Sequence, residues 1–163
     1  TAPYTFQGKL RTYQNKTLRY RGHYARFKAL LDAGLLEEEP VQVGEVAVSS
    51  RQLLHVLLEP RLRPAPEDRD LVAIRVRCTG EKGGLRAEVV VQLLDYYDDQ
   101  TGFTAMERTT GWHASIMAIA MAQGVTPRGA KPVELALPGQ YFAAAMKRRG
   151  FRVTERLTVW KDW

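Results

Sequence analysis

The sequence predicts an α+β domain with a mixed, largely antiparallel sheet and helices packed on it. Two alternating apolar runs, residues 71–79 and 85–96, flank a short glycine-containing turn, which is typical of a β-hairpin. Apolar residues at helical spacing occur elsewhere, without strict strand–helix–strand alternation. The chain has 163 residues, of which 45% are hydrophobic and 26% charged, as in globular proteins. We therefore expect one folded domain over residues 1–163.

The first elements are a strand and a helix. Aromatic and β-tolerant residues predict a strand over 4–13. A helix is expected over 23–33, since Phe27, Leu30 and Leu31 fall at the spacing of one helix face. Gly34 stands where a glycine ends a helix.

The next segment, residues 41–50, forms a short strand or an extended loop. Ser49 or Ser50 is expected to cap a helix that ends before Pro60. This helix is expected to bury its leucines, namely Leu53, Leu54, Leu57 and Leu58.

The hairpin follows, with Val72, Ile74, Val76 and Cys78 on one face of its first strand. Arg75 and Arg77 lie on the other face. The position of Cys78 predicts an inert core residue.

After a turn at 98–102, residues 103–110 are expected to form a third antiparallel strand. Thr109 or Thr110 then caps a helix over about 111–123, which Gly124 ends. A last helix over 139–149 ends at Gly150. A closing strand over 151–160 has Phe151, Val153, Leu157 and Val159 facing inward.

Several function classes are excluded by composition. The single cysteine allows no intramolecular disulfide and no cysteine-rich zinc site, and it fits a reducing, cytoplasmic location. No apolar stretch approaches the roughly 20 residues that span a membrane. No G-x-G-x-x-G or G-x-x-x-x-G-K-[ST] motif is present, so the chain carries no recognisable phosphate-binding loop. Because residue 1 is not Met, we expect either a processed chain or, preferably, a chain that begins inside a longer protein.

The net charge of +6 is concentrated near the start of the chain. Residues 1–31 contain no acidic residue. Aromatic residues alternate there with seven basic ones: Lys9, Arg11, Lys16, Arg19, Arg21, Arg26 and Lys28. This pattern suits a nucleic-acid surface, but no RNP1 or GXXG motif is present, so a solvated basic face with aromatics packed inward is the favoured interpretation.

A denser polar cluster precedes the first predicted helix. Arg19, Tyr20, Arg21 and His23 fall within five residues. An arginine fork can hold a carboxylate, and a histidine exchanges protons near neutral pH. The alternative is a helix-entry turn with exposed arginines.

A second polar segment covers residues 95–113. Asp95, Asp98 and Asp99 can bind a cation or an amine, or can simply form a turn. Free backbone N–H groups near Arg108, Thr109, Thr110 and Gly111 can hold a carboxylate, or the threonines can be plain N-caps. The three histidines form no H-x-x-x-H pair, so no metal site is expected.

These segments carry a family resemblance. TLRYRGHY at 17–24 and LLDYYDDQTGFTAMERTTG at 93–111 resemble motifs of the saccharopine dehydrogenase and lysine 6-dehydrogenase family, in the same order. The resemblance extends over about residues 8–155 and is that of the family's C-terminal domain. Arg21 stands where the family usually has proline.

The resemblance implies a substrate-binding and dimerisation domain whose fold is similar to the C-terminal domain of glyceraldehyde-3-phosphate-dehydrogenase-like enzymes. The whole enzyme would be a homodimer that acts on the C–N bond of lysine, saccharopine or a related amino acid. NAD or NADP would be bound mainly by a separate Rossmann domain. Two other functions stay open: a basic nucleic-acid-binding module and a non-catalytic oligomerisation domain.

The resemblance also suggests roles for individual residues. Arg19, with Arg108 in reserve, would hold the substrate carboxylate, while Tyr20 and His23 orient the substrate or relay a proton. Asp95 or Glu107 would face an ammonium group. The remaining expected substrate contacts are Thr109, Thr110 and Gly111.

Overall fold

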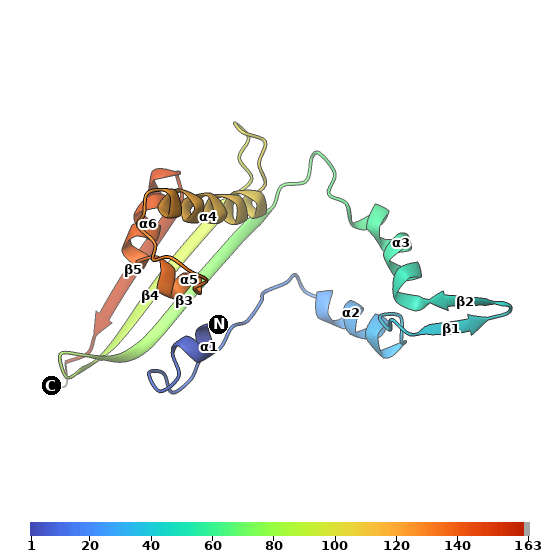
Figure 1. Ribbon diagram of the computed structural model, residues 1–163, viewed down its shortest axis with the longest axis horizontal. Helices are drawn as coiled ribbons and strands as arrows, with labels where there is room; N and C mark the ends of the chain where they lie inside the picture. The colour runs from blue at the N-terminus through green and yellow to red at the C-terminus, as the bar shows by residue number, and fades with distance from the viewer. Residues whose placement is uncertain (162–163) are drawn as a thin grey trace. The chain divides into compact units, whose positions relative to one another are not determined.

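The computed structural model describes residues 1–161, which divide into two compact units (Figure 1). Unit 1 comprises Thr1–Gln7 and the chain from Arg69 onward, and unit 2 comprises Gly8–Asp68. The α+β class is confirmed, and all paired strands among the described residues are antiparallel. One domain over residues 1–163 stays a prediction.

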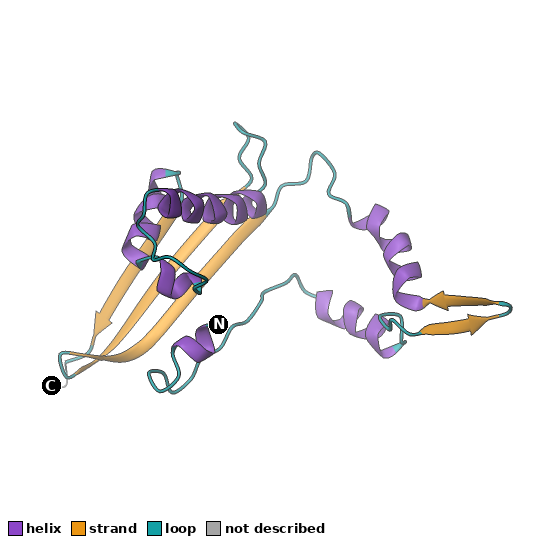
Figure 2. Cartoon of the chain, viewed as in Figure 1, coloured by secondary structure: helices purple, strands orange, loops and turns teal. Residues whose placement is uncertain are grey.

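Unit 1 is built on a three-stranded sheet in the order β3-β4-β5 (Figure 2). Its strands are β3 (Leu71–Lys82), β4 (Leu85–Tyr96) and β5 (Arg152–Val159). The predicted hairpin of β3 and β4 is confirmed, and β5 matches the predicted closing strand. Ile74 pairs with Leu93, which pairs in turn with Val153. Paired residues share one face of a sheet, so these three side chains lie on the same side.

Helices cover that face (Figure 1). They are α4 (Ala105–Ala122), α5 (Val133–Ala136) and α6 (Gly139–Arg148), while α1 (Ala2–Thr5) adjoins α5 through a 2.9 Å hydrogen bond from Thr5 to Glu134. The core lies between α4, α6 and the sheet. Its buried residues are Ile116, Ala120, Leu137, Ala145, Met146 and Phe151, and Leu93 and Val153 pack against them.

Part of the same sheet face is left exposed. Ile74, Val76, Leu157 and Val159, here called the apolar strip, lie on the helix-bearing side but are 38–50% exposed. The predicted alternation of β3 is therefore right, whereas the inward burial of Leu157 and Val159 is not. Cys78 was also predicted wrongly, because it is exposed rather than part of the core.

Helix α4 begins earlier than predicted. A strand over 103–110 is wrong, since the only pairing found there within the described residues is the isolated bridge of Phe103 with Asp98. Thr104 accepts a hydrogen bond from the Glu107 amide, and the Glu107 carboxylate accepts from the Thr104 amide. This capping box starts the helix at Ala105 instead of near residue 111.

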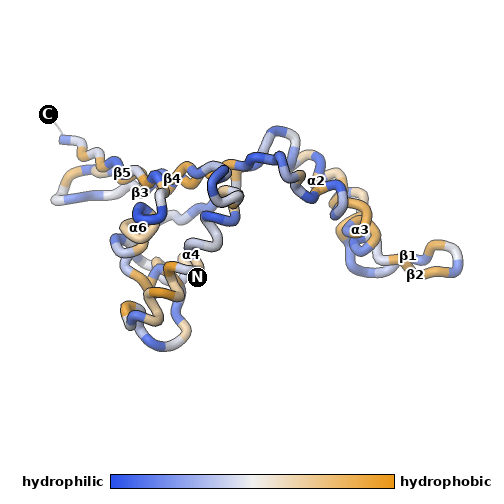
Figure 3. Tube along the Cα trace, turned by 90° about the horizontal axis from the view of Figure 1, so that it is seen from above, coloured by the Kyte–Doolittle hydropathy of each residue, from blue (hydrophilic) through white to orange (hydrophobic). Residues whose placement is uncertain are grey.

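Unit 2 contains two helices and a hairpin: α2 (His23–Asp32), β1 (Pro40–Val43), β2 (Val46–Ser49) and α3 (Ser50–Leu62). The expected helix, the glycine after it and the Ser49 cap are confirmed. No residue of unit 2 is buried, although hydrophobic residues run along α3 and the β1–β2 hairpin (Figure 3). The burial expected for the leucines of α3 is therefore not found, since Leu53 and Leu57 are exposed and Leu54 and Leu58 are only partly buried.

Two further expectations are wrong. Residues 4–13 form no strand, because Pro3 occupies the first turn of α1 and no neighbouring strand pairs with the residues after it. Helix α3 continues through Pro60 to Leu62. The Arg63 amide donates to the Glu59 carbonyl at 3.2 Å, which keeps the last turn helical despite the missing proline N–H.

Candidate functional site

The N-terminus of α4 is the most polar part of unit 1. Asp70, just before β3, accepts hydrogen bonds from the amides of Ala105 at 2.6 Å and Met106 at 2.9 Å. With the Thr104–Glu107 capping box, this satisfies the first three amides of the helix, which have no partner within it. The positive end of the helix dipole favours the carboxylates placed there.

Arg108 joins this helix end to the sheet. Its Nε donates to Asp95 Oδ2 at 2.9 Å, and its Nη1 donates to Asp98. The Arg108 side chain is only 12% exposed, and its guanidinium carbon lies 5.1 Å from the centre of the Phe151 ring. Arg108 and Asp95, both predicted as site residues, are thus brought together, with the arginine already holding two carboxylates of its own chain.

Local hydrogen bonds also act on Asp98. The Gln100 amide donates to Asp98 Oδ1 at 3.0 Å. This bond is the largest cause that lowers the pKa of Asp98, and Thr101 and the Arg108 charge lower it further against the opposing effect of desolvation. Asp98 is therefore ionised at neutral pH.

The other predicted residues of this region lie within the first two turns of α4. Thr109 donates to the Ala105 carbonyl at 2.8 Å, and Thr110 contacts the Met106 sulfur at 3.8 Å. The free amides expected near Thr109, Thr110 and Gly111 are not found, because these residues lie inside the helix rather than at its start. The open amides belong to residues 105–107 instead, where Asp70 and Thr104 fill them.

Negative charge prevails around this helix end. Its carboxylates are Asp70, Asp95, Asp98, Asp99 and Glu107. Within residues 1–161, Arg108 pairs with Asp95 and Asp98, and Arg69 with Asp99. Arg69 lies 3.4 Å from Asp99 and over the Tyr97 ring. A surface of this kind attracts an ammonium group rather than a second carboxylate.

The remaining predicted residues form a turn in unit 2. The His23 amide donates to the Tyr20 carbonyl at 3.1 Å, and Gly22 has φ 89° and ψ −13°. These angles are those of the third residue of a type II turn, a position that requires positive φ and therefore favours glycine. The turn places Arg21 at the second position, where proline is common.

The side chains of this turn point to solvent. Arg19 donates to the neighbouring Leu18 carbonyl at 3.1 Å, Tyr20 is 84% exposed, and the His23 ring lies 4.6 Å from the ring of Phe27. Arg19, Tyr20 and His23 therefore gather at the entrance of α2, as expected. They belong to unit 2, whereas Asp95, Glu107 and Arg108 belong to unit 1.

Both groups of residues lie in a part of the chain that matches a known family. The sequence model of the saccharopine dehydrogenase C-terminal domain matches residues 2–151. The chain belongs to this family. The resemblance predicted over residues 8–155 is confirmed.

Membership in the saccharopine dehydrogenase C-terminal domain family places the chain in an oxidoreductase family that is NAD(P)-dependent in general, with the cofactor site in the other domain. The 163 residues contain no G-x-G-x-x-G loop, the motif with which Rossmann domains hold the pyrophosphate of a dinucleotide. No helix in the described part of the chain is long and apolar enough to cross a membrane. Nor do three or more His, Cys, Asp or Glu side chains gather within residues 1–161 as a metal site requires.

One important residue of the region was missed. Asp70 is 35 residues from the helix that it caps, so no local pattern connects the two. The start of α4, in contrast, has a local signal. Thr104 and Glu107 stand at the spacing of a capping box, and this spacing outweighs the weak strand pattern of residues 103–110.

Proposed function

We propose that this chain forms the substrate side of the active-site cleft in an NAD(P)-dependent oxidoreductase acting on the C–N bond of lysine, saccharopine or a related basic amino acid. The observation that carries this proposal is the family match over residues 2–151. The nicotinamide, held by the other domain, supplies hydride transfer. The residues of this chain bind and orient the amino acid.

The excess of negative charge at the N-terminus of α4 supports the binding of a positively charged substrate group. Five carboxylates surround this helix end, and the pKa of Asp98 is held below its ordinary value. We assign the contact with the substrate ammonium to Asp95 or Glu107, and a role in orienting Asp95 to Arg108, which bonds Asp95 and Asp98. Thr109, Thr110 and Gly111 line the same helix end in this proposal.

The entrance of α2, in unit 2, has an arginine that could bind a substrate carboxylate. The Arg19 guanidinium makes one hydrogen bond, to the Leu18 carbonyl, among those that the structure gives for residues 1–161. Its remaining donors are available to a carboxylate in a bidentate arrangement. Tyr20 and His23, on the same turn, are proposed to orient the substrate or relay a proton.

The test uses the full-length enzyme with Arg19→Gln. Reduction of NAD⁺ or NADP⁺ is followed with lysine and saccharopine, and leucine serves as a neutral comparison. Loss of a charged hydrogen-bond partner is expected to lower kcat/KM by roughly tenfold to a hundredfold for the basic substrates. Arg11→Gln, an exposed arginine of the same segment, is the matched control and should leave kcat/KM unchanged. Equal activity of the Arg19→Gln variant and wild type would exclude Arg19 as the clamp.

A subunit contact is the second part of the proposal. Large apolar patches exposed on a protein surface mark interaction sites. The apolar strip of unit 1 exposes such side chains, with Val76 half exposed and Leu157 42% exposed, and the exposed Glu155 is the charged residue on the same face between Val153 and Leu157. We assign the homodimer contact to this strip. Sedimentation velocity should give the mass of two chains.

A further inference from the structure

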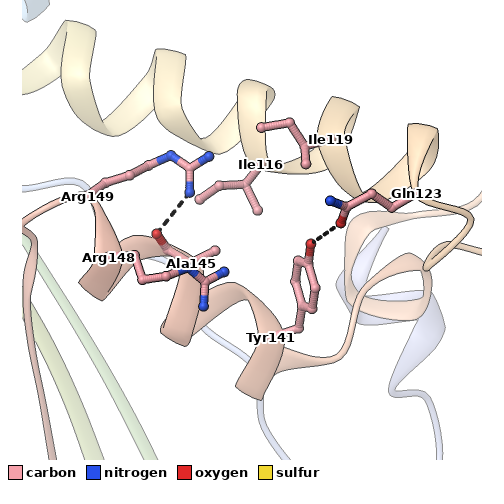
Figure 4. A pocket seen from close by; sticks show the side chains of 7 residues that line it. All are labelled: Ile116, Ile119, Gln123, Tyr141, Ala145, Arg148 and Arg149. Atoms are coloured by element: carbon pink, nitrogen blue, oxygen red, sulfur yellow. Dashed lines mark hydrogen bonds between the residues drawn. The ribbon is translucent and has the colours of Figure 1, made fainter.

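A hollow of about 300 Å³ lies between the C-terminal half of α4 and helix α6 (Figure 4). This volume is at the lower end of the range for small-molecule pockets. The residues that line it are Ile116, Ile119, Gln123, Tyr141, Ala145, Arg148 and Arg149. None of the candidate site residues discussed above lines it. Arg108, in the first turn of α4, precedes Ile116 by eight residues, about 12 Å along the helix axis.

One end of this pocket carries two positive charges. Arg149 Nη1 donates to the Ala145 carbonyl at 3.0 Å, and its guanidinium carbon lies 5.5 Å from the centre of the Trp112 ring, which holds the group in place. Arg148 is next to it in sequence and is exposed. No acidic residue lines the pocket, and the structure pairs neither arginine with a carboxylate among residues 1–161. An anion bound here would be attracted by both guanidinium groups.

The other end of the pocket is polar but neutral. The Tyr141 hydroxyl donates to Gln123 Oε1 at 3.0 Å, so the amide nitrogen of Gln123 keeps its own hydrogen atoms for another acceptor (Figure 4). Between the two ends stand apolar side chains. Ile116 forms part of the core, and Ile119 is 40% exposed beside it.

We propose that this pocket binds a small aliphatic carboxylic acid that carries a second oxygen function. Its carboxylate would meet Arg148 and Arg149, and its hydrocarbon chain would cover Ile119, which is 40% exposed. The second carbonyl or carboxylate oxygen would accept a hydrogen bond from Gln123. A compact inorganic anion satisfies only the arginine end and leaves Ile119 exposed to water, so the layout favours an organic acid.

The test measures binding of glutarate to the full chain by isothermal titration calorimetry. Inorganic phosphate and the uncharged diamide of glutarate are measured in parallel. We expect glutarate to bind at least about tenfold more tightly than either, because only glutarate satisfies both ends and covers Ile119. Nuclear magnetic resonance shifts on adding glutarate should centre on Gln123, Tyr141 and Ala145.

The matched variants are Arg148→Gln and Arg152→Gln. Arg148 lines the pocket, whereas Arg152 is an exposed arginine on β5 that does not. Removing one charged partner should weaken glutarate binding roughly tenfold in Arg148→Gln and leave it unchanged in Arg152→Gln. Since both side chains are exposed, neither change threatens the fold. Equal weakening in both variants, equal binding of phosphate, or no binding of glutarate would overturn the proposal.

Discussion

Arg21 occupies the second position of the turn that presents Arg19, Tyr20 and His23. It has a negative φ like every other non-glycine residue described, and no backbone partner is found for its amide among residues 1–161. Proline fits such a position because its fixed φ matches the turn and it has no N–H to lose. The arginine found here can adopt the backbone angles of this turn but, unlike proline, is not restricted to them.

We predict that Arg21→Pro stabilises the protein by about 0.4–1 kcal/mol, because proline reduces the freedom of the unfolded chain without straining the folded one. Urea unfolding measures the change. Arg26→Pro is the control and should be strongly destabilising, since the Arg26 amide donates to the Gly22 carbonyl inside α2 at 3.1 Å. A loss of stability in Arg21→Pro would contradict the type II turn.

Asp98 allows a prediction of pH dependence. Its pKa is lowered in the folded protein from the ordinary value of 3.8, chiefly by the Gln100 amide. A carboxyl group with a lowered folded-state pKa stabilises the fold above its unfolded-state pKa, and that stability is lost as the pH falls through the folded-state value. The difference in free energy of unfolding between wild type and Asp98→Asn should therefore be constant near neutral pH and shrink as the pH falls below about 4.

Urea unfolding of both proteins from neutral pH down to about pH 3 tests this prediction. Repeating the series at roughly 0.5 M salt separates the causes, because salt screens the charge of Arg108 but leaves the backbone hydrogen bond from Gln100 largely intact. The pH dependence should persist at high salt. A difference that does not change with pH would contradict the role of Asp98.

At the scale of elements, sequence patterns worked where one local rule acted alone. The β3–β4 hairpin follows from its alternation, and helix α2 from its apolar spacing and terminal glycine. The start of α4 was missed because two local patterns competed, and the capping box of Thr104 and Glu107 prevailed. The Asp70 cap and the pairing of Arg108 with Asp95 and Asp98 join segments that are distant in sequence or in different elements. No local rule reaches such contacts.

The two caps of α4 should differ in strength. Asp70 is charged and bonds two amides, one of them on the fully buried Ala105, whereas Thr104 bonds one exposed amide. We expect Asp70→Ala to cost about 2–4 kcal/mol and Thr104→Ala about 1 kcal/mol in the free energy of unfolding. Urea unfolding of the two variants gives the comparison. If Asp70→Ala lowers the free energy of unfolding by no more than Thr104→Ala does, water must hydrogen-bond the Ala105 and Met106 amides in place of the Asp70 carboxylate.

At the scale of the whole molecule, apolar surface is left over. Unit 2 buries no residue within itself, and unit 1 exposes the apolar strip beside a complete core. The sequence predicted these side chains as apolar faces correctly but assigned their burial to this chain alone. Periodicity shows which face is apolar, and it contains no information on what covers that face. Such surface is expected in one part of a larger enzyme.

The homodimer contact proposed for the strip can be tested at Val76, on strand β3. In Val76→Asp a carboxylate would have to lose its water on association, which costs several kcal/mol unless it is paired. We therefore expect this variant to sediment as a monomer at concentrations where the wild type is a dimer. Because Val76 is half exposed in the single chain, the fold should survive the change.

Thr154→Asp is the matched control for this experiment. Thr154 lies on β5 opposite Gln92, and its side chain points to the other face of the sheet from Val153 and the strip. The same charge placed there should leave the dimer intact. If both variants stay dimeric, the contact lies elsewhere on the chain. If both dissociate, the two faces act together, and the assignment to the strip alone is wrong.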